Sequence, residues 1–121
     1  MSRPLFPEPT PAIAAKRKAL APKQLEAWQN FSHTVFADGA LPEKIKHLIA
    51  VAVAHTTQCP YCIHGHTRAA LRTGATEEQI MEAIWVAAEM RSGAAYAHSA
   101  LAIDEMQQVA EHSAAPAAHH A

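Results

Sequence analysis

The chain has 121 residues and a formal net charge of −1, from 10 basic and 11 acidic side chains. This length is typical of one domain, and the balanced charge excludes a nucleic-acid binder that relies on a basic surface. Half of the residues are hydrophobic, but many of these are alanines, so large side chains for a core are few. Because so small a domain buries only about two thirds of its unfolded surface, we expect the protein to assemble with further copies of itself.

Neither end of the chain has an apolar pattern. Residues 1–11 are rich in proline, and residues 112–121 are mainly alanine and histidine. We expect a loose segment at 1–11, a single helical domain at 12–111 and a flexible tail at 112–121. No apolar stretch of about 20 residues would span a membrane, and the first residues do not form a secretory signal. We therefore expect a soluble cytoplasmic protein with no membrane partner and no nucleic-acid partner.

The first part of the folded chain predicts three helices in succession. Apolar side chains at helical spacing predict helices over 12–20 and 23–36, and Asp38-Gly39 ends the second of them. Pro42 begins the third helix, in which residues 48–54 are apolar on almost every side. A helix with this pattern is buried by several neighbours, so the third helix is predicted to be the central one.

The second part of the chain continues the helical pattern. Pro60 begins a helix that Gly74 ends, and a capping box at 76–79 begins a long apolar pattern. Ser92-Gly93 is expected to bend or divide this pattern, so that a last helix runs toward Glu111. The sequence contains neither alternating strand patterns nor a glycine-rich phosphate loop. We therefore predict an all-α bundle of about six helices.

Two cysteines lie three positions apart in the segment Cys59-Pro60-Tyr61-Cys62. A thioredoxin-like site would need a strand before this motif, whereas both flanking segments have helical period. At a helix start the thiols lie near unpaired backbone N–H groups and the positive end of the helix dipole, which lowers a thiol pKa below about 8.5. Residues three apart on a helix are about 5 to 6 Å apart, so the pair can close into a disulfide. The motif predicts a redox-active pair.

Two histidines are candidates for proton transfer at this pair. His66 follows Cys62 by four residues, hence on the same helix face, where it can act as a base or as a cation that holds the thiolate. His47 lies about as far before the turn as His66 lies after it. If the two helices pack antiparallel, the imidazoles can face each other, and His47 can relay a proton or orient His66. We therefore predict Cys59, Cys62, His66 and His47 as the catalytic residues.

A zinc site is the main alternative use of these side chains. Its four ligands would be Cys59, Cys62, His64 and His66, all within eight residues. Helix geometry opposes this site, because His64 lies two residues from both Cys62 and His66 and points away from the face that they share. It could bind only if the stretch is not helical or if another chain donates ligands. We expect neither a metal nor a cofactor.

Three residues of the last predicted helices each have two alternative roles. His98 can approach the site from the last helix, or it can be a surface side chain. Trp85 and Tyr96 are large aromatic side chains, which are more often found in a core or in a subunit contact than in a ligand site. The sequence leaves both alternatives open for each aromatic residue.

Taken together, three segments resemble a known family. They are Leu41–Ala54, the motif Cys59-x-x-Cys62-x-x-x-His66, and Gly74–Ile80 preceded by alanines at 69 and 70. The chain resembles the carboxymuconolactone decarboxylase-like superfamily over about 41–105, and its cysteine motif resembles the alkylhydroperoxidase D branch. The resemblance implies an all-helical fold, trimers or hexamers, and thiol peroxidase or disulfide reductase activity. By position it makes Cys62 the attacking thiolate, Cys59 the resolving thiol and His66 part of a proton relay.

One position departs from the pattern of that branch. The family relay commonly has a glutamate twelve residues before the first cysteine, where this chain has His47. A histidine can pass a proton but does not supply the negative charge that would make His66 a better base. Because the chain has both cysteines, which favours the redox branch, we expect a hydroperoxide substrate and a dithiol or disulfide-reductase electron donor. A decarboxylase-like lyase that does not use the cysteines and a non-catalytic redox-sensing oligomer remain the alternatives.

Overall fold

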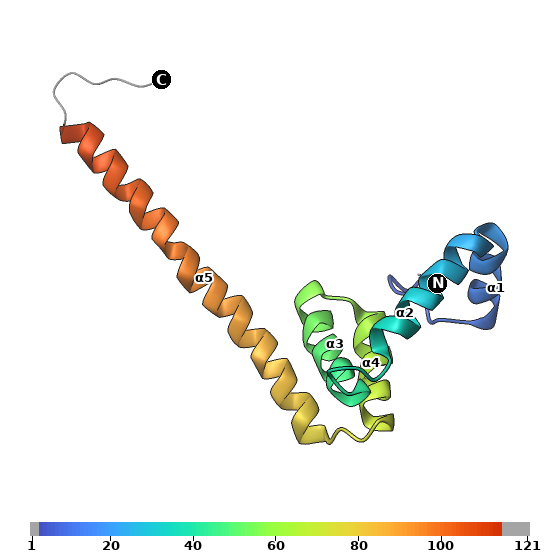
Figure 1. Ribbon diagram of the computed structural model, residues 1–121. Helices are drawn as coiled ribbons and strands as arrows, with labels where there is room; N and C mark the ends of the chain where they lie inside the picture. The colour runs from blue at the N-terminus through green and yellow to red at the C-terminus, as the bar shows by residue number, and fades with distance from the viewer. Residues whose placement is uncertain (1–2, 115–121) are drawn as a thin grey trace.

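The computed structural model describes residues 3–114 and contains five helices in that range. In chain order they are α1 (Pro11–Leu20), α2 (Pro22–Phe36), α3 (Glu43–Thr57), α4 (Pro60–Arg72) and α5 (Glu77–Ala114). Residues 3–114 include no strand, so the predicted all-α class is confirmed. Within this range no helix is long and apolar enough to cross a membrane. Figure 1 shows α3 and α4 side by side, with α1 and α2 at one side and α5 extending away.

Side-chain caps mark the starts of α1 and α5. The Thr10 hydroxyl accepts a hydrogen bond of 3.2 Å from the Ile13 N–H at the start of α1. At α5 the predicted capping box is present: Gln79 N–H donates to the Thr76 hydroxyl at 3.1 Å, and Thr76 N–H donates to the Gln79 side chain at 3.0 Å. These bonds satisfy backbone donors that a helix start otherwise leaves unpaired.

The core is small and lies around α3. Val51 and Ala70 are both fully buried, and they form one cluster with Ala75 and Ile80. Because alanine has no side chain beyond Cβ, Ala70 allows α4 to lie close against α3. α3 also contacts α2 and α5, which confirms its predicted central place. Its outer face is uncovered in this chain, since Val53 is 52% exposed.

The predicted division of the long apolar pattern at Ser92-Gly93 is wrong. α5 is one continuous helix of 38 residues, which is why the fold has five helices rather than about six. A single glycine costs a helix interior only about 1 kcal/mol relative to alanine, and no proline is present to remove a hydrogen bond. The Glu89 carboxylate also lies over Gly93, and the Ser92 hydroxyl bonds back to the Glu89 carbonyl at 3.0 Å.

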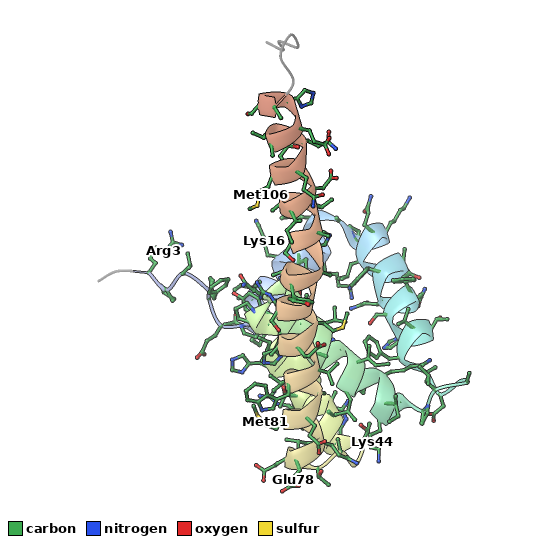
Figure 2. All side chains as sticks on the ribbon, turned by 90° about the vertical axis from the view of Figure 1, so that its left-hand side faces the viewer. Arg3, Lys16, Lys44, Glu78, Met81 and Met106 are labelled. Atoms are coloured by element: carbon green, nitrogen blue, oxygen red, sulfur yellow. A yellow bond between two sulfur atoms is a disulfide. The ribbon has the colours of Figure 1, made fainter. Side chains whose placement is uncertain are left out.

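The far end of α5 projects from the rest of the molecule. At about 1.5 Å per residue, the helix is about 57 Å long, and each residue from 94 to 114 is exposed. Figure 2 shows side chains, including Met106, standing out around this helix. Trp85 and Tyr96 are 65% and 82% exposed, so neither is a core residue of this chain. Residues 112–114 of the predicted tail belong to α5, and residues 1–2 and 115–121 lie outside the described residues.

The continuity of α5 predicts the effect of replacing its glycine. We expect Gly93→Ala to raise the free energy of unfolding by about 1 kcal/mol, because alanine is the better residue in a helix interior. The matched substitution Gly74→Ala should instead lower it by about 1 kcal/mol or more, because Gly74 has a φ of 101°, where a Cβ is strained. Chemical denaturation followed by circular dichroism measures both. A loss of stability and of helix content in Gly93→Ala would contradict an unbroken α5.

Candidate active site

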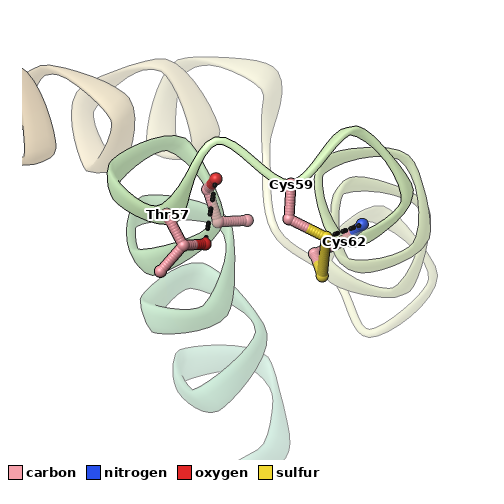
Figure 3. The surroundings of a disulfide bond; sticks show 4 residues. Thr57, Cys59 and Cys62 are labelled. Atoms are coloured by element: carbon pink, nitrogen blue, oxygen red, sulfur yellow. Dashed lines mark hydrogen bonds between the residues drawn. A yellow bond between two sulfur atoms is a disulfide. The ribbon is translucent and has the colours of Figure 1, made fainter. Parts of the chain in front are cut away.

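The two cysteines form a disulfide at the point where α4 begins. Cys59 is the N-cap residue of α4, and its Sγ accepts a hydrogen bond of 3.2 Å from the Cys62 N–H. The two Cα atoms are 5.3 Å apart, and the sulfur atoms are bonded. Figure 3 shows this bond beside Thr57, at the end of α3. Both side chains are partly buried, so reduced thiols here would lie at the positive end of the helix dipole, which favours the thiolate.

A tight turn between α3 and α4 places this motif. Gln58 ends α3 in the left-handed conformation, with a φ of 57°. The Cys59 N–H then donates to the Ala54 carbonyl at 3.0 Å, which satisfies an acceptor at the helix end. Pro60 follows as the first residue of α4, where its missing N–H has no cost. The chain therefore reverses direction within three residues, so that Cys59 lies directly between the end of α3 and the start of α4.

The same reversal brings the two predicted histidines together. His47 Nδ1 on α3 lies 3.1 Å from His66 Nδ1 on α4, which is hydrogen-bonding distance. His47 is only 5% exposed, whereas His66 is partly buried. The expected juxtaposition of the two imidazoles is confirmed.

Glu43 and Phe36 complete the surroundings of the imidazoles, and the sequence analysis did not identify either. Glu43 Oε1 is 3.2 Å from His47 Nε2, one helical turn earlier on α3. The Phe36 ring, at the end of α2, stacks on His47 at 4.8 Å between centroids and on His66 at 4.9 Å. The spacing of four residues between Glu43 and His47 could have revealed the first contact. No spacing rule connects Phe36 to α3, because the contact depends on how α2 packs.

The environment of His66 favours the neutral imidazole. Burial and the neighbouring His47 lower the pKa of His66 below its usual value of 6.5. Burial acts because the charged form loses solvation, and His47 acts because two positive charges this close repel. His66 is therefore unprotonated at neutral pH and can accept a proton. Its Nδ1 faces His47, so Nε2 is the nitrogen that remains for exchange.

A cavity of about 280 Å³ opens beside the imidazoles. Its walls combine three imidazoles, one phenyl ring, one carboxylate and one guanidinium group. The lining residues are Ser32, His33, Phe36, Ala37, Glu43, His47, His66 and Arg72. This volume is near the lower limit for small-molecule sites, about 300 Å³. Neither cysteine lines the cavity, and no hydrogen bond joins His66 to either sulfur atom within residues 3–114.

The N-terminal segment reaches the cysteine motif from the other end of the chain. The Tyr61 hydroxyl, between the two cysteines in sequence, donates a hydrogen bond of 2.6 Å to the Pro7 carbonyl. The Phe6 ring meets the Tyr61 ring edge to face, with centroids 6.1 Å apart. Residues 6 and 7 therefore lie against the motif.

The other candidate ligands and bases lie apart from this cluster. His98 is exposed on the projecting part of α5, and its imidazole is bonded to the Ala94 carbonyl at 2.8 Å. His64, the fourth ligand of the alternative zinc site, is exposed. Among residues 3–114 no group of three or more His, Cys, Asp or Glu side chains is arranged to hold a metal ion.

Known proteins are similar to this chain in sequence and in fold. A protein from the cox locus of Paracoccus denitrificans, itself uncharacterised, is 62% identical over 84 residues, which cover 69% of this chain and 76% of that protein. A crystal structure from Methanobacterium thermoautotrophicum matches with a TM-score of 0.64 at 35% identity, covering 68% of this chain and 94% of that one.

A second solved structure connects the fold to a named family. A carboxymuconolactone decarboxylase family protein from Legionella pneumophila matches with a TM-score of 0.64 at 30% identity, covering 80% of this chain and 87% of that one. The sequence profile of the carboxymuconolactone decarboxylase family matches residues 22–106. This range contains α2, α3, α4 and most of α5, together with both cysteines and both imidazoles. The chain therefore belongs to the carboxymuconolactone decarboxylase family.

Proposed function

We propose that this protein is a thiol-dependent hydroperoxidase, or disulfide oxidoreductase, of the alkylhydroperoxidase D type. The observation that carries the proposal is the disulfide between Cys59 and Cys62 at the start of α4. His66 lies one turn further along the same helix, and His47 holds its imidazole at 3.1 Å. A dithiol that can close, beside a neutral base, is suited to two-electron redox chemistry.

The reaction begins with the reduced pair. His66 accepts the proton of the Cys62 thiol, and the thiolate attacks one oxygen of the hydroperoxide. The O–O bond breaks, a sulfenic acid forms on Cys62, and the alkoxide leaves as an alcohol after taking the proton from His66. The Cys59 thiol then attacks the sulfenic sulfur and releases water, which forms the disulfide. The hydroperoxide is reduced by two electrons, and the thiol pair is oxidised by two.

An external dithiol completes the cycle. Its thiolate attacks one sulfur of the Cys59–Cys62 bond, and its second thiol resolves the mixed disulfide. The products are the reduced pair and the oxidised donor, so atoms and electrons balance over the cycle. Cys59 and Cys62 are partly buried rather than enclosed, which leaves the bond open to such a donor. No resident cofactor takes part in these steps.

A decarboxylase-like lyase is the second candidate, because the family match covers most of the folded chain. That activity would not use the cysteines. A redox-sensing oligomer is the third, because a disulfide can close once and alter packing without turnover. The three candidates differ in what substitution of the cysteines does to activity.

The first test is turnover of an organic hydroperoxide with a dithiol reductant. We expect the wild type to complete many cycles, and Cys62→Ser to lose turnover because the attacking thiolate is absent. In Cys59→Ser without the reductant, the Cys62 thiolate should still react once and stop at a sulfenic acid, because the resolving thiol is absent. Hydroperoxide loss at matched protein concentration measures all three.

Equal hydroperoxide loss by the wild type and Cys62→Ser would contradict the proposal. A single stoichiometric oxidation of the wild type would favour the sensor. Lactone or decarboxylase activity that survives the loss of both cysteines would favour the lyase.

The lowered pKa of His66 predicts the pH dependence of thiol oxidation. His66 is the base only when neutral, so the single-turnover rate should fall as pH drops through a pKa below 6.5. In His66→Gln the rate should be lower by about 10²-fold. The fall in rate at acid pH that is due to protonation of His66 should be absent from its pH profile. Stopped-flow oxidation of the reduced enzyme across pH measures both. An identical acid limb in His66→Gln would exclude His66 as the base.

We also propose that the functional form is a homo-oligomer, a trimer or a hexamer. The support is α5, which carries large apolar side chains on several sides and is exposed over residues 94–114. Leu101 is 68% exposed and Met106 is 67% exposed. Large apolar side chains that are exposed together on one segment are typical of a surface that binds a partner. Further copies of this chain would supply the surface that its own core lacks.

The proposed assembly predicts a loss of subunit association when charge is added to α5. We expect Leu101→Glu with Met106→Glu to sediment as single 13.0 kDa chains, because two buried charges would be desolvated in the interface. The control is Gln107→Glu with Gln108→Glu, which adds the same charge to the same helix at polar positions. Sedimentation velocity measures the mass. A wild-type protein that is itself monomeric would contradict the assembly.

A further inference from the structure

A carboxylate in the imidazole cluster lies at a position other than the one the family relay uses. The relay position twelve residues before Cys59 is occupied by His47. Glu43, one turn earlier on α3, places Oε1 3.2 Å from His47 Nε2. Its side chain is 41% exposed, whereas that of His47 is 7% exposed. The series of contacts from Glu43 through His47 to His66 therefore leads from the rim of the cavity to the helix that carries Cys62.

The hydrogen-bonding capacity of each group determines where the protons lie. An ionised carboxylate can only accept a hydrogen bond, so His47 must carry a proton on Nε2. A neutral imidazole with its proton on Nε2 has a lone pair on Nδ1. The contact of 3.1 Å between the two Nδ1 atoms must then be a donation from His66 Nδ1–H to His47. His66 is left with its lone pair on Nε2.

We propose that Glu43 is a positioning residue that selects, through His47, the tautomer of His66 whose Nε2 can accept a proton. The inference rests on the proposed function, in which the lone pair on His66 Nε2 accepts the proton of the Cys62 thiol. It also restores to the relay the negative charge that His47 itself does not provide. After His66 takes the thiol proton, its positive charge can move to His47, where the Glu43 carboxylate is in direct contact.

The surroundings of the cluster make the choice of tautomer depend on Glu43. His47 is buried, so bulk water is a poor substitute for a missing acceptor. Phe36 stacks on both rings and presents no hydrogen-bonding group to either. Without Glu43, His47 can carry its proton on Nδ1 and donate it to His66. His66 would then hold its own proton on Nε2 and could not act as the base.

The tautomers can be measured directly by nitrogen-15 NMR of the imidazole rings at neutral pH. In the wild type we expect His66 to carry its proton on Nδ1 and His47 to carry its proton on Nε2. In Glu43→Ala the proton of His66 should shift toward Nε2. The control is Glu77→Ala, because Glu77 is also the first residue of a helix and its loss likewise removes a negative charge from a helix N-terminus. Glu77→Ala should leave both tautomers unchanged.

Single-turnover oxidation of the reduced enzyme provides the second readout. We expect Glu43→Ala to be slower by about 10-fold or more, within the range of general acid–base effects, and Glu77→Ala to match the wild type. The proposal is overturned if wild-type His66 carries its proton on Nε2, a result that needs no variant to fold. It is also overturned if the tautomers of Glu43→Ala and the wild type are the same. The NMR readout does not need peroxidase activity, so a wild type that turns over no hydroperoxide would refute the proposed function separately.

Discussion

The close packing of α3 against α4 is the constraint on which the site depends. Val51 and Ala70 are both fully buried at this contact, and a larger residue at either position would separate the helices. The separation of the helices determines whether His47 and His66 lie at 3.1 Å or out of reach. The turn that joins them makes Cys59 the N-cap of α4. One packing contact thus sets both the imidazole pair and the place of the disulfide.

The buried polar groups of the site are stabilised by hydrogen bonds to one another rather than by an excess of charge. Burying one imidazole against another is unfavourable when both are charged, and it is favourable when the neutral rings donate and accept in sequence. Glu43 supplies the acceptor at the end of that sequence, 3.2 Å from His47. Phe36 stacks on both rings and so covers them with an apolar surface. The lowered pKa of His66 follows from the same burial.

The sequence was sufficient to predict those parts of the structure that depend on neighbouring residues along the chain. Helical period, the capping box that begins at Thr76 and the prolines at helix starts placed the helix starts to within a few residues. The pairing of His47 with His66 followed from their similar distances from the turn. Phe36 could not be predicted, because its contact depends on how α2 crosses α3. The division at Ser92-Gly93 was wrong because a preference of about 1 kcal/mol is outweighed by the hydrogen bonds on either side.

The residues of the candidate active site and the exposed apolar side chains of α5 lie in different parts of the molecule. Cys59, Cys62, His66, His47 and Glu43 all belong to α3, α4 and the turn between them. Exposed large apolar side chains also lie on α5, whose residues 94–114 are all exposed. The proposed proton transfer therefore involves groups of one chain, whereas the proposed assembly would cover the exposed part of α5. Both α3 and α4 contact α5, so a neighbour bound to α5 would act on the site through the packing of these two helices.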